Sequence, residues 1–121
     1  MDLDRAQAFA ETWVAEWNAH DLDRIMRHYA DDVVFRSPIA ARLVEGSNGT
    51  IRGKDALRAY WAEGLRHNPD LRFEVVGVYA GVDCVVINFR KQTGALANEV
   101  LVFDDDLIVS GWGTSEIRCV R

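Results

Sequence analysis

Residues 13–37, WVAEWNAHDLDRIMRHYADDVVFRS, contain the change of pattern that decides the fold. The stretch opens on the end of an apolar stripe with steps of three and four residues, which is typical of a helix. Asp21 is placed to cap a second, short helix, and Asp31-Asp32 is expected to end it. Val33-Val34-Phe35 is β-branched and aromatic, as in a strand. The stretch therefore predicts two helices that feed directly into a strand.

Outward from this stretch, apolar spacing extends the first of these helices back towards the N-terminus and predicts a third helix after the strand. Asp2 or Asp4 can cap the first helix, and a later helix is expected between Gly53 and Asn68-Pro69. The first helix carries the stripe Leu3, Ala6, Ala10, Trp13 and Trp17, and the later one carries Leu57, Tyr60, Trp61, Gly64 and Leu65. Residues 39–53, IAARLVEGSNGTIRG, contain three glycines and predict a long loop of the kind that often serves as a lid.

The second half of the chain predicts four strands with short turns between them. The strands are expected at residues 71–80, 82–90, 96–103 and 107–116. Turns this short favour antiparallel hairpins over crossover connections. Helices followed by strands indicate one α+β domain over residues 1–121, with three helices of the N-terminal half packed on the concave face of a curved antiparallel sheet.

Composition narrows the possible partners. Hydrophobic residues make up 49% of the chain and charged residues 27%, as in soluble globular proteins. A formal net charge of −5 disfavours binding to nucleic acid and to anionic lipid. No apolar run is long enough to cross a membrane, and the acidic N-terminus is unlike a signal peptide. Two cysteines without CxxC spacing indicate reduced thiols, so we expect a cytoplasmic protein.

Three segments resemble the nuclear transport factor 2-like superfamily, and within it the SnoaL-like and ketosteroid-isomerase-like branch. They are WNAHDLDRIMRHYADDVVF (17–35), GKDALRAYW (53–61) and EVLVFDDDLIVSGW (99–112). The resemblance spans nearly the whole chain and implies a cone-shaped, barrel-like, cystatin-like fold around a hydrophobic pocket. It does not imply one activity, because the superfamily contains isomerases, cyclases, hydrolases, dehydratases and non-catalytic binding modules.

The ketosteroid-isomerase-like members imply three catalytic positions in this sequence. Their general base falls eight residues after Tyr29, at Ser37, which cannot take a proton from carbon at neutral pH. Their oxyanion-stabilising tyrosine falls on Trp13, whose indole N–H can donate a hydrogen bond but has no acid chemistry. Their second oxyanion group falls four residues before Phe103, at Glu99, which is a comparable carboxylic acid. One of the three positions therefore holds a matching group.

Glu99 is the candidate catalytic residue, and its role depends on which face of the strand points inward. Glu99 alternates with Leu101 and Phe103, so these three side chains share a face. If that face is inward, burial raises the pKa of Glu99, which then acts as an acid or a hydrogen-bond donor. In the alternatives, Glu99 pairs with an arginine, or the inward face consists of Asn98, Val100 and Val102.

The predicted pocket takes an apolar small molecule that carries a carbonyl or an epoxide. The expected ligand-binding residues are Trp13, Trp17, Tyr29, Phe35, Ser37, Tyr60, Leu101 and Trp112. We expect no metal, because the histidines lack ligand spacing, and no cofactor, because GxGxxG and P-loop motifs are absent.

Two functions from different classes remain open at the level of sequence. The first is an acid–base enzyme or ligand-binding protein of the SnoaL-like kind. The second is a non-catalytic dimerisation or protein-binding module that uses the outer face of the sheet, for example Leu96, Val100 and Val102. The resemblance implies a homodimer through that outer face in either case, and apolar side chains on both faces of the strands agree with it.

Overall fold

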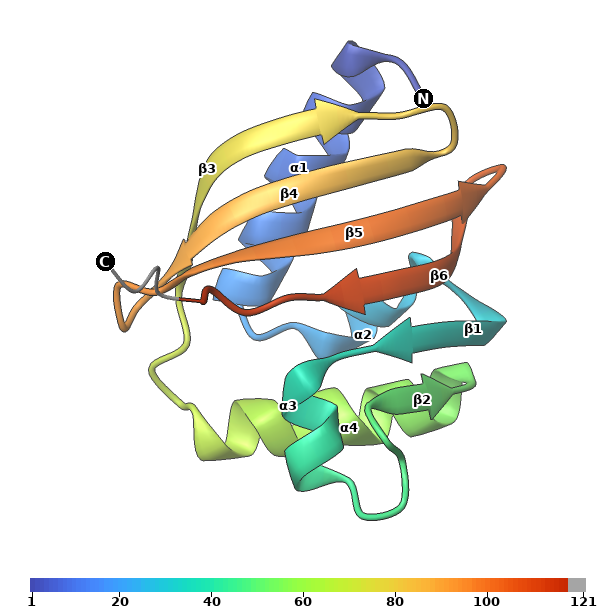
Figure 1. Cartoon of the computed structure of the whole chain (residues 1–121). Coiled ribbons are helices and arrows are strands. Elements are labelled where there is room, and N and C mark those ends of the chain that lie inside the picture. Colours follow the sequence, from blue (N-terminus) through green and yellow to red (C-terminus); the bar gives the residue numbers. More distant parts are fainter. Residues whose placement is uncertain (118–121) are drawn as a thin grey trace.

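A six-stranded sheet curves around two of the helices in the computed structural model, which describes residues 1–117 (Figure 1). The helices are α1 (Leu3–Asn18), α2 (Leu22–Met26), α3 (Pro38–Leu43) and α4 (Lys54–His67). The strands are β1 (Tyr29–Arg36), β2 (Thr50–Arg52), β3 (Phe73–Ala80), β4 (Cys84–Lys91), β5 (Leu96–Asp104) and β6 (Leu107–Gly113). The predicted α+β class is confirmed, and the curved sheet stays open instead of closing into a barrel.

The strands lie in the order β2-β1-β6-β5-β4-β3. The hairpins β3–β4, β4–β5 and β5–β6 are antiparallel, as the short turns predict, and so is β1–β2. β1 and β6 pair in parallel, which the expectation of an antiparallel sheet did not include. This pairing is possible because two helices and four strands, from α3 to β5, separate β1 from β6 along the chain, which is ample length for a parallel connection.

Helices α1 and α4 cover the concave face, where their aromatic side chains meet those of the sheet. The Trp13 ring stacks on Phe73 with centroids 5.6 Å apart, and it meets Phe89 at 5.0 Å. One turn later, Trp17 meets Trp61 of α4 edge to face at 5.1 Å. The predicted stripe of α1 is buried from Ala6 to Trp17, whereas Leu3 in the first turn is exposed. None of the helices within residues 1–117 combines the length and apolar character of a membrane span.

The long loop predicted for residues 39–53 is wrong, because most of this segment is regular structure. Ser37 caps α3 by accepting a hydrogen bond from the Ile39 N–H at 3.2 Å, and Pro38 occupies the first turn, where its missing N–H costs nothing. Thr50–Arg52 then pairs with β1 as β2. A segment held at both ends in this way is not a free lid.

The second helix is also shorter than predicted. It ends at Met26, and the strand begins at Tyr29, which was expected on the helix. The His28 carbonyl accepts the Ile108 N–H at 2.8 Å, so pairing with β6 takes over where the helix stops. This tertiary bond outweighs the local preference for another helical turn.

The outer face of the sheet carries no helix within the described chain and is partly apolar. Cross-strand pairs place Tyr79, Val86, Val100 and Trp112 in one row across four strands. Tyr79 is 61% exposed and Trp112 is 37% exposed. Asn88 and Arg90 lie on the same face, because they alternate with buried residues of β4.

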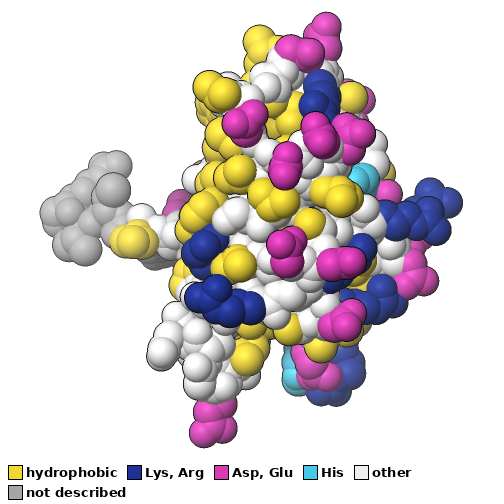
Figure 2. Space-filling model, turned by 90° about the vertical axis from the view of Figure 1, so that its right-hand side faces the viewer, with side chains coloured by type: hydrophobic (Ala, Val, Ile, Leu, Met, Phe, Trp, Pro, Cys, Tyr) yellow, Lys and Arg dark blue, Asp and Glu magenta, His cyan; other side chains and the backbone are white. Residues whose placement is uncertain are grey.

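Acidic side chains are spread over the side of the molecule seen in Figure 2. This distribution agrees with the formal net charge of −5. The surface therefore repels anions in general, and any anion that binds must find a local cation.

Candidate functional site

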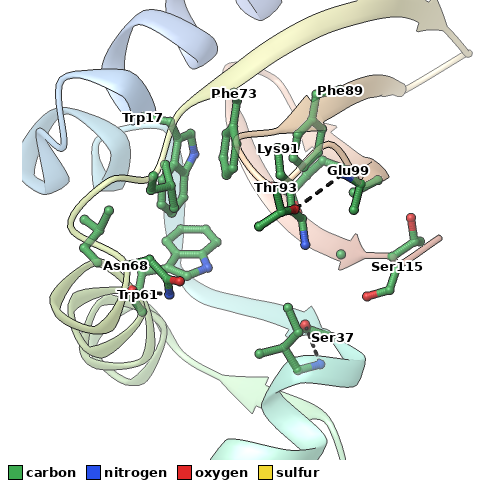
Figure 3. A pocket seen from close by; sticks show the side chains of 18 of the residues that line it. Trp17, Ser37, Trp61, Asn68, Phe73, Phe89, Lys91, Thr93, Glu99 and Ser115 are labelled. Carbon is green, nitrogen blue, oxygen red and sulfur yellow. Dashed lines mark hydrogen bonds between the residues drawn. The ribbon is translucent and has the colours of Figure 1, made fainter.

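A cavity of about 340 Å³ opens between helices α1, α3 and α4 and the strands β1, β3, β4, β5 and β6. Figure 3 shows its wall, with Trp17 and Trp61 from the helices facing Phe73 and Phe89 from the sheet. Its lining includes Trp17, Phe35, Ser37, Tyr60, Trp61, Phe73, Phe89, Lys91, Ala97, Glu99, Gly113 and Ser115.

The aromatic wall is a connected cluster and not a set of separate rings. Trp61 meets Trp17 at 5.1 Å and Phe35 at 5.3 Å, both edge to face. Phe73 and Phe89 lie with their centroids 4.6 Å apart. Rings that fix one another in this way form a rigid apolar surface, which suits a flat ligand that excludes water.

Glu99 points into this cavity from the middle of β5. It is only 8% exposed, and its strand neighbours on the same face, Ala97 and Leu101, are buried. The alternative in which Asn98 and Val100 face inward is therefore wrong. Among the described residues, no arginine or lysine forms an ion pair with Glu99.

Burial raises the pKa of Glu99 to about 8, and the positive charge of Lys91 opposes this rise only in part. The side chain is therefore mostly a neutral carboxylic acid at pH 7, with one O–H to donate. Gly113 of the neighbouring strand leaves room beside it, since a Cβ atom there would lie 3.4 Å from Glu99 Oε1.

Ser37 and Tyr60 form a second polar pair on the cavity wall. The Ser37 and Tyr60 hydroxyl oxygens lie 3.3 Å apart, and Ser37 Oγ also accepts the Ile39 N–H. Burial raises the pKa of Tyr60, an effect that the hydrogen bond with Ser37 reduces. Tyr60 therefore keeps its proton at neutral pH, and this pair can offer one hydroxyl hydrogen to a bound oxygen atom.

Three buried polar atoms lie beside this wall without a hydrogen-bond partner in the described chain. They are the indole nitrogens of Trp13 and Trp17 and the hydroxyl of Tyr29. Burial raises the pKa of Tyr29 well above its usual value, and the nearby acids Glu99 and Glu16 add to the effect. Of the three residues, only Trp17 lines the cavity, so its N–H is the one nearest to a possible ligand.

The structure brings five of the nine predicted site residues to the cavity. Trp17, Phe35, Ser37, Tyr60 and Glu99 line it. Trp13, Tyr29 and Leu101 belong to the buried core and do not line it, although each was expected to contact the ligand.

Trp112 lies on the wrong face for a ligand-binding residue of this cavity. It pairs with Val100 and with Arg36, and all three side chains point outward. The Arg36 guanidinium lies over the Trp112 ring, 4.4 Å from its centroid. A cation–π contact of this kind stabilises an exposed indole.

Other lining residues were not predicted from the sequence, among them Trp61, Phe73, Phe89 and Lys91. Trp61 belongs to the predicted helical stripe from which only Tyr60 was expected to contact the ligand. Lys91 continues the inward row Val85-Ile87-Phe89 of β4, so alternation with these three apolar residues could have found it. Within residues 1–117, no group of three metal-binding side chains comes together.

Comparison with known proteins identifies the family. The family model of the SnoaL-like domain matches residues 10–111, so the chain belongs to the SnoaL-like domain family, within the nuclear transport factor 2-like superfamily. None of the curated proteins matches the chain.

Solved structures share the fold over nearly the whole chain. A SnoaL-like protein of unknown function from Burkholderia thailandensis is 42% identical, with a TM-score of 0.90 over 97% of this chain and 99% of that one. AclR from Streptomyces galilaeus, a candidate hydroxylase, is 23% identical, with a TM-score of 0.75 over 97% and 92%. A protein with a cystatin-like fold from Methylobium petroleophilum is 12% identical, with a TM-score of 0.74 over 99% and 81%. The last two similarities concern the fold alone.

Proposed function

We propose that this SnoaL-like protein binds a flat, apolar small molecule and activates an oxygen atom on it by hydrogen bonding from neutral Glu99. The observation that supports this proposal is a carboxyl group, 8% exposed, that faces an aromatic cavity without an ion-pair partner in the described chain. Burying a polar group without a partner costs stability, so its retention is explained if a ligand supplies the partner.

The chemistry that fits is acid-assisted. A protonated Glu99 donates a hydrogen bond to a carbonyl or epoxide oxygen. When a nucleophile such as water adds to the carbon bonded to that oxygen, the C=O π bond or the epoxide C–O bond breaks, and Glu99 stabilises the negative charge that develops on the oxygen. Ser37 or Tyr60 can provide a second donor. Ser37 occupies the position where a carboxylate base would be needed for ketosteroid-type isomerisation, and no second carboxylate lines the cavity within residues 1–117. Activation of an oxygen atom therefore fits these side chains better than proton abstraction from carbon.

A matched pair of ligands tests the role of Glu99. We expect fluorenone to bind about tenfold more tightly than fluorene, which has the same shape but no carbonyl, since one hydrogen bond contributes about 1 kcal/mol or more. Replacing Glu99 with Met should remove this preference and leave fluorene binding unchanged. Quenching of tryptophan fluorescence measures both affinities, because Trp17 and Trp61 line the cavity.

The control for this experiment is Glu74→Met, which changes an exposed glutamate of β3. This variant should retain the preference for fluorenone. A preference for fluorenone that survives Glu99→Met would contradict the proposed role of Glu99.

We also propose that the outer face of the sheet is covered by a second copy of the chain. The row Tyr79, Val86, Val100 and Trp112 is apolar and crosses four strands. A two-fold axis near Val86 and Val100 would bring Tyr79 of one copy towards Trp112 of the other and cover both exposed rings. The same outer face would be the working surface in the second candidate function, a non-catalytic dimerisation or protein-binding module.

Size-exclusion chromatography with light scattering tests the dimer at micromolar concentration. We expect a dimer for the unmodified chain and a monomer for Val100→Glu, since a charge at the centre of an apolar interface is not solvated. Val76→Glu is a control at an exposed valine of β3 outside the row and should remain dimeric. A monomeric unmodified chain would contradict the proposal.

A further inference from the structure

The ionisable side chains of the cavity are unbalanced in charge. Among the described residues that line it, Lys91 and Glu99 are the ones that carry a formal charge when ionised in water at neutral pH. Glu99 is mostly neutral at pH 7, because burial raises its pKa to about 8. The cavity is therefore left with one positive charge, in a protein whose formal net charge is −5.

Lys91 belongs to the cavity and not to the general surface. It is half-buried and continues the inward row of Val85, Ile87 and Phe89 along β4. In Figure 3 it lies on the same side of the cavity as Phe89 and Thr93. The side chain is thus directed to the concave face by strand alternation.

The side chains of the residues next to Lys91 are held by structural hydrogen bonds, whereas the Lys91 side chain is not. Arg90 donates to the Gly94 carbonyl at 2.9 Å, and the Gln92 side chain accepts the Arg72 N–H at 3.1 Å. The ammonium group of Lys91 forms neither a hydrogen bond nor an ion pair with any residue of the described chain. A half-buried lysine without an acidic partner is a binding group for an anion that comes from outside the chain.

The strand register fixes how far apart Lys91 and Glu99 stand. Glu99 pairs with Ile87, four residues before Lys91, and Phe89 pairs with Ala97 between them. At roughly 3.3 Å per residue the two positions are about 13 Å apart along the strand. The charge of Lys91 nevertheless acts on Glu99, so the two side chains approach each other more closely than their backbone positions do. Both groups line the cavity, and a compound of two or three fused rings matches a span of this order.

We propose that the natural ligand is an anion, with an apolar ring system between an oxygen atom held at Glu99 and a carboxylate or acidic enol held at Lys91. This inference rests on the proposed function, because it assumes that the ligand occupies the same cavity. It adds the charge of the ligand and its orientation, with the acidic group at the end of β4.

Binding of anthraquinone-2-carboxylate and anthraquinone-2-carboxamide tests this proposal. The two compounds share a ring system with carbonyl groups and differ in charge. We expect the carboxylate to bind about tenfold more tightly at low salt, by isothermal titration, since charge-assisted hydrogen bonds are roughly twice as strong as neutral ones. Lys91→Met should remove this preference by weakening binding of the carboxylate, and Lys91→Arg should retain it.

Lys54→Met is the matched control, because Lys54 begins α4 and does not line the cavity. It should retain the preference for the carboxylate. Equal affinities for the two compounds, or a preference that survives Lys91→Met, would overturn the inference and leave the cavity as the binding site. If neither compound binds, the proposed function falls together with the inference. The carboxamide therefore reports on the cavity, and the difference between the two compounds reports on Lys91.

Discussion

Glu99→Gln is expected to make the protein more stable than the unmodified chain at pH 9 and nearly equal to it at pH 5. In the unfolded chain the carboxyl group has its usual pKa near 4.5, whereas burial raises the pKa of Glu99 in the folded protein to about 8. Between these values the folded protein keeps a proton that the unfolded chain loses. The contribution of Glu99 to the free energy of unfolding is therefore fully present below about pH 4.5, and it is lost as the pH rises towards and through 8.

The size of this effect follows from the difference between the two pKa values. Each pKa unit corresponds to about 1.4 kcal/mol, so this one group lowers the free energy of unfolding by about 5 kcal/mol between pH 4.5 and pH 9. Such a loss is a large share of the 5–15 kcal/mol typical of a domain. The charged groups that face Glu99 do not cancel it, since Lys91 opposes the rise only in part and Tyr29 and Tyr60 keep their protons.

Urea unfolding at pH 5, 7 and 9 gives the free energy of unfolding of Glu99→Gln and of the unmodified chain. The free energy of unfolding of the variant minus that of the unmodified chain should increase with pH. Glu74→Gln, at an exposed position of β3, is the control and should give the same difference at all three values. A constant difference for Glu99→Gln would mean that Glu99 ionises like a solvated carboxyl, and the neutral donor of the proposed function would then be lost.

Sequence analysis located Glu99 because strand alternation is a local property. Leu101 and Phe103 at steps of two share a face with Glu99, and the sequence left open whether that face points inward. The structure shows that it does. The same rule applied to Trp112 would have required the register of β6, which shifts between Val102 and Phe103 of its partner strand. A bulge moves side chains to the other face without leaving a mark in the sequence.

The segment after Ser37 was misread for a different reason. Three glycines made residues 39–53 look like a loop, whereas Ser37-Pro38 is a local signal for the start of a helix. β2 has only three residues and exists because β1 offers it an edge. Short elements of this kind depend on tertiary pairing, which composition does not reveal.

The parallel pairing of β1 with β6 was not predicted from the sequence either. This pairing places Phe35 of β1 next to Gly111 of β6, where only a glycine fits. Gly111 pairs with Phe35 of β1 on one side and with Leu101 of β5 on the other. A Cβ atom on Gly111 would lie 2.8 Å from Phe35 Cδ2 and 3.2 Å from Leu101 Cδ2. The Phe35 ring covers this glycine and forms part of the cavity wall.

Gly111→Ala is therefore expected to destabilise the protein by about 2–3 kcal/mol, as overpacking of a filled core does. Phe35 cannot move aside easily, since it is 2% exposed and meets Trp61 at 5.3 Å. Any shift of its ring away from the new methyl group brings it towards Trp61 and the cavity, so fluorenone should also bind more weakly. Urea unfolding and fluorescence quenching measure the two effects.

Gly113→Ala provides the matched control two residues along the same strand. There the nearest atoms, Glu99 Oε1 and Phe35 Cζ, would lie 3.4 and 3.5 Å from the new Cβ, which is ordinary contact. We expect its stability to change by less than about 0.5 kcal/mol, in the range of substitutions that break no packing. Equal effects at Gly111 and Gly113 would show that the cost comes from the backbone of β6, and the close approach of Phe35 to Gly111 would no longer explain why a glycine is needed there.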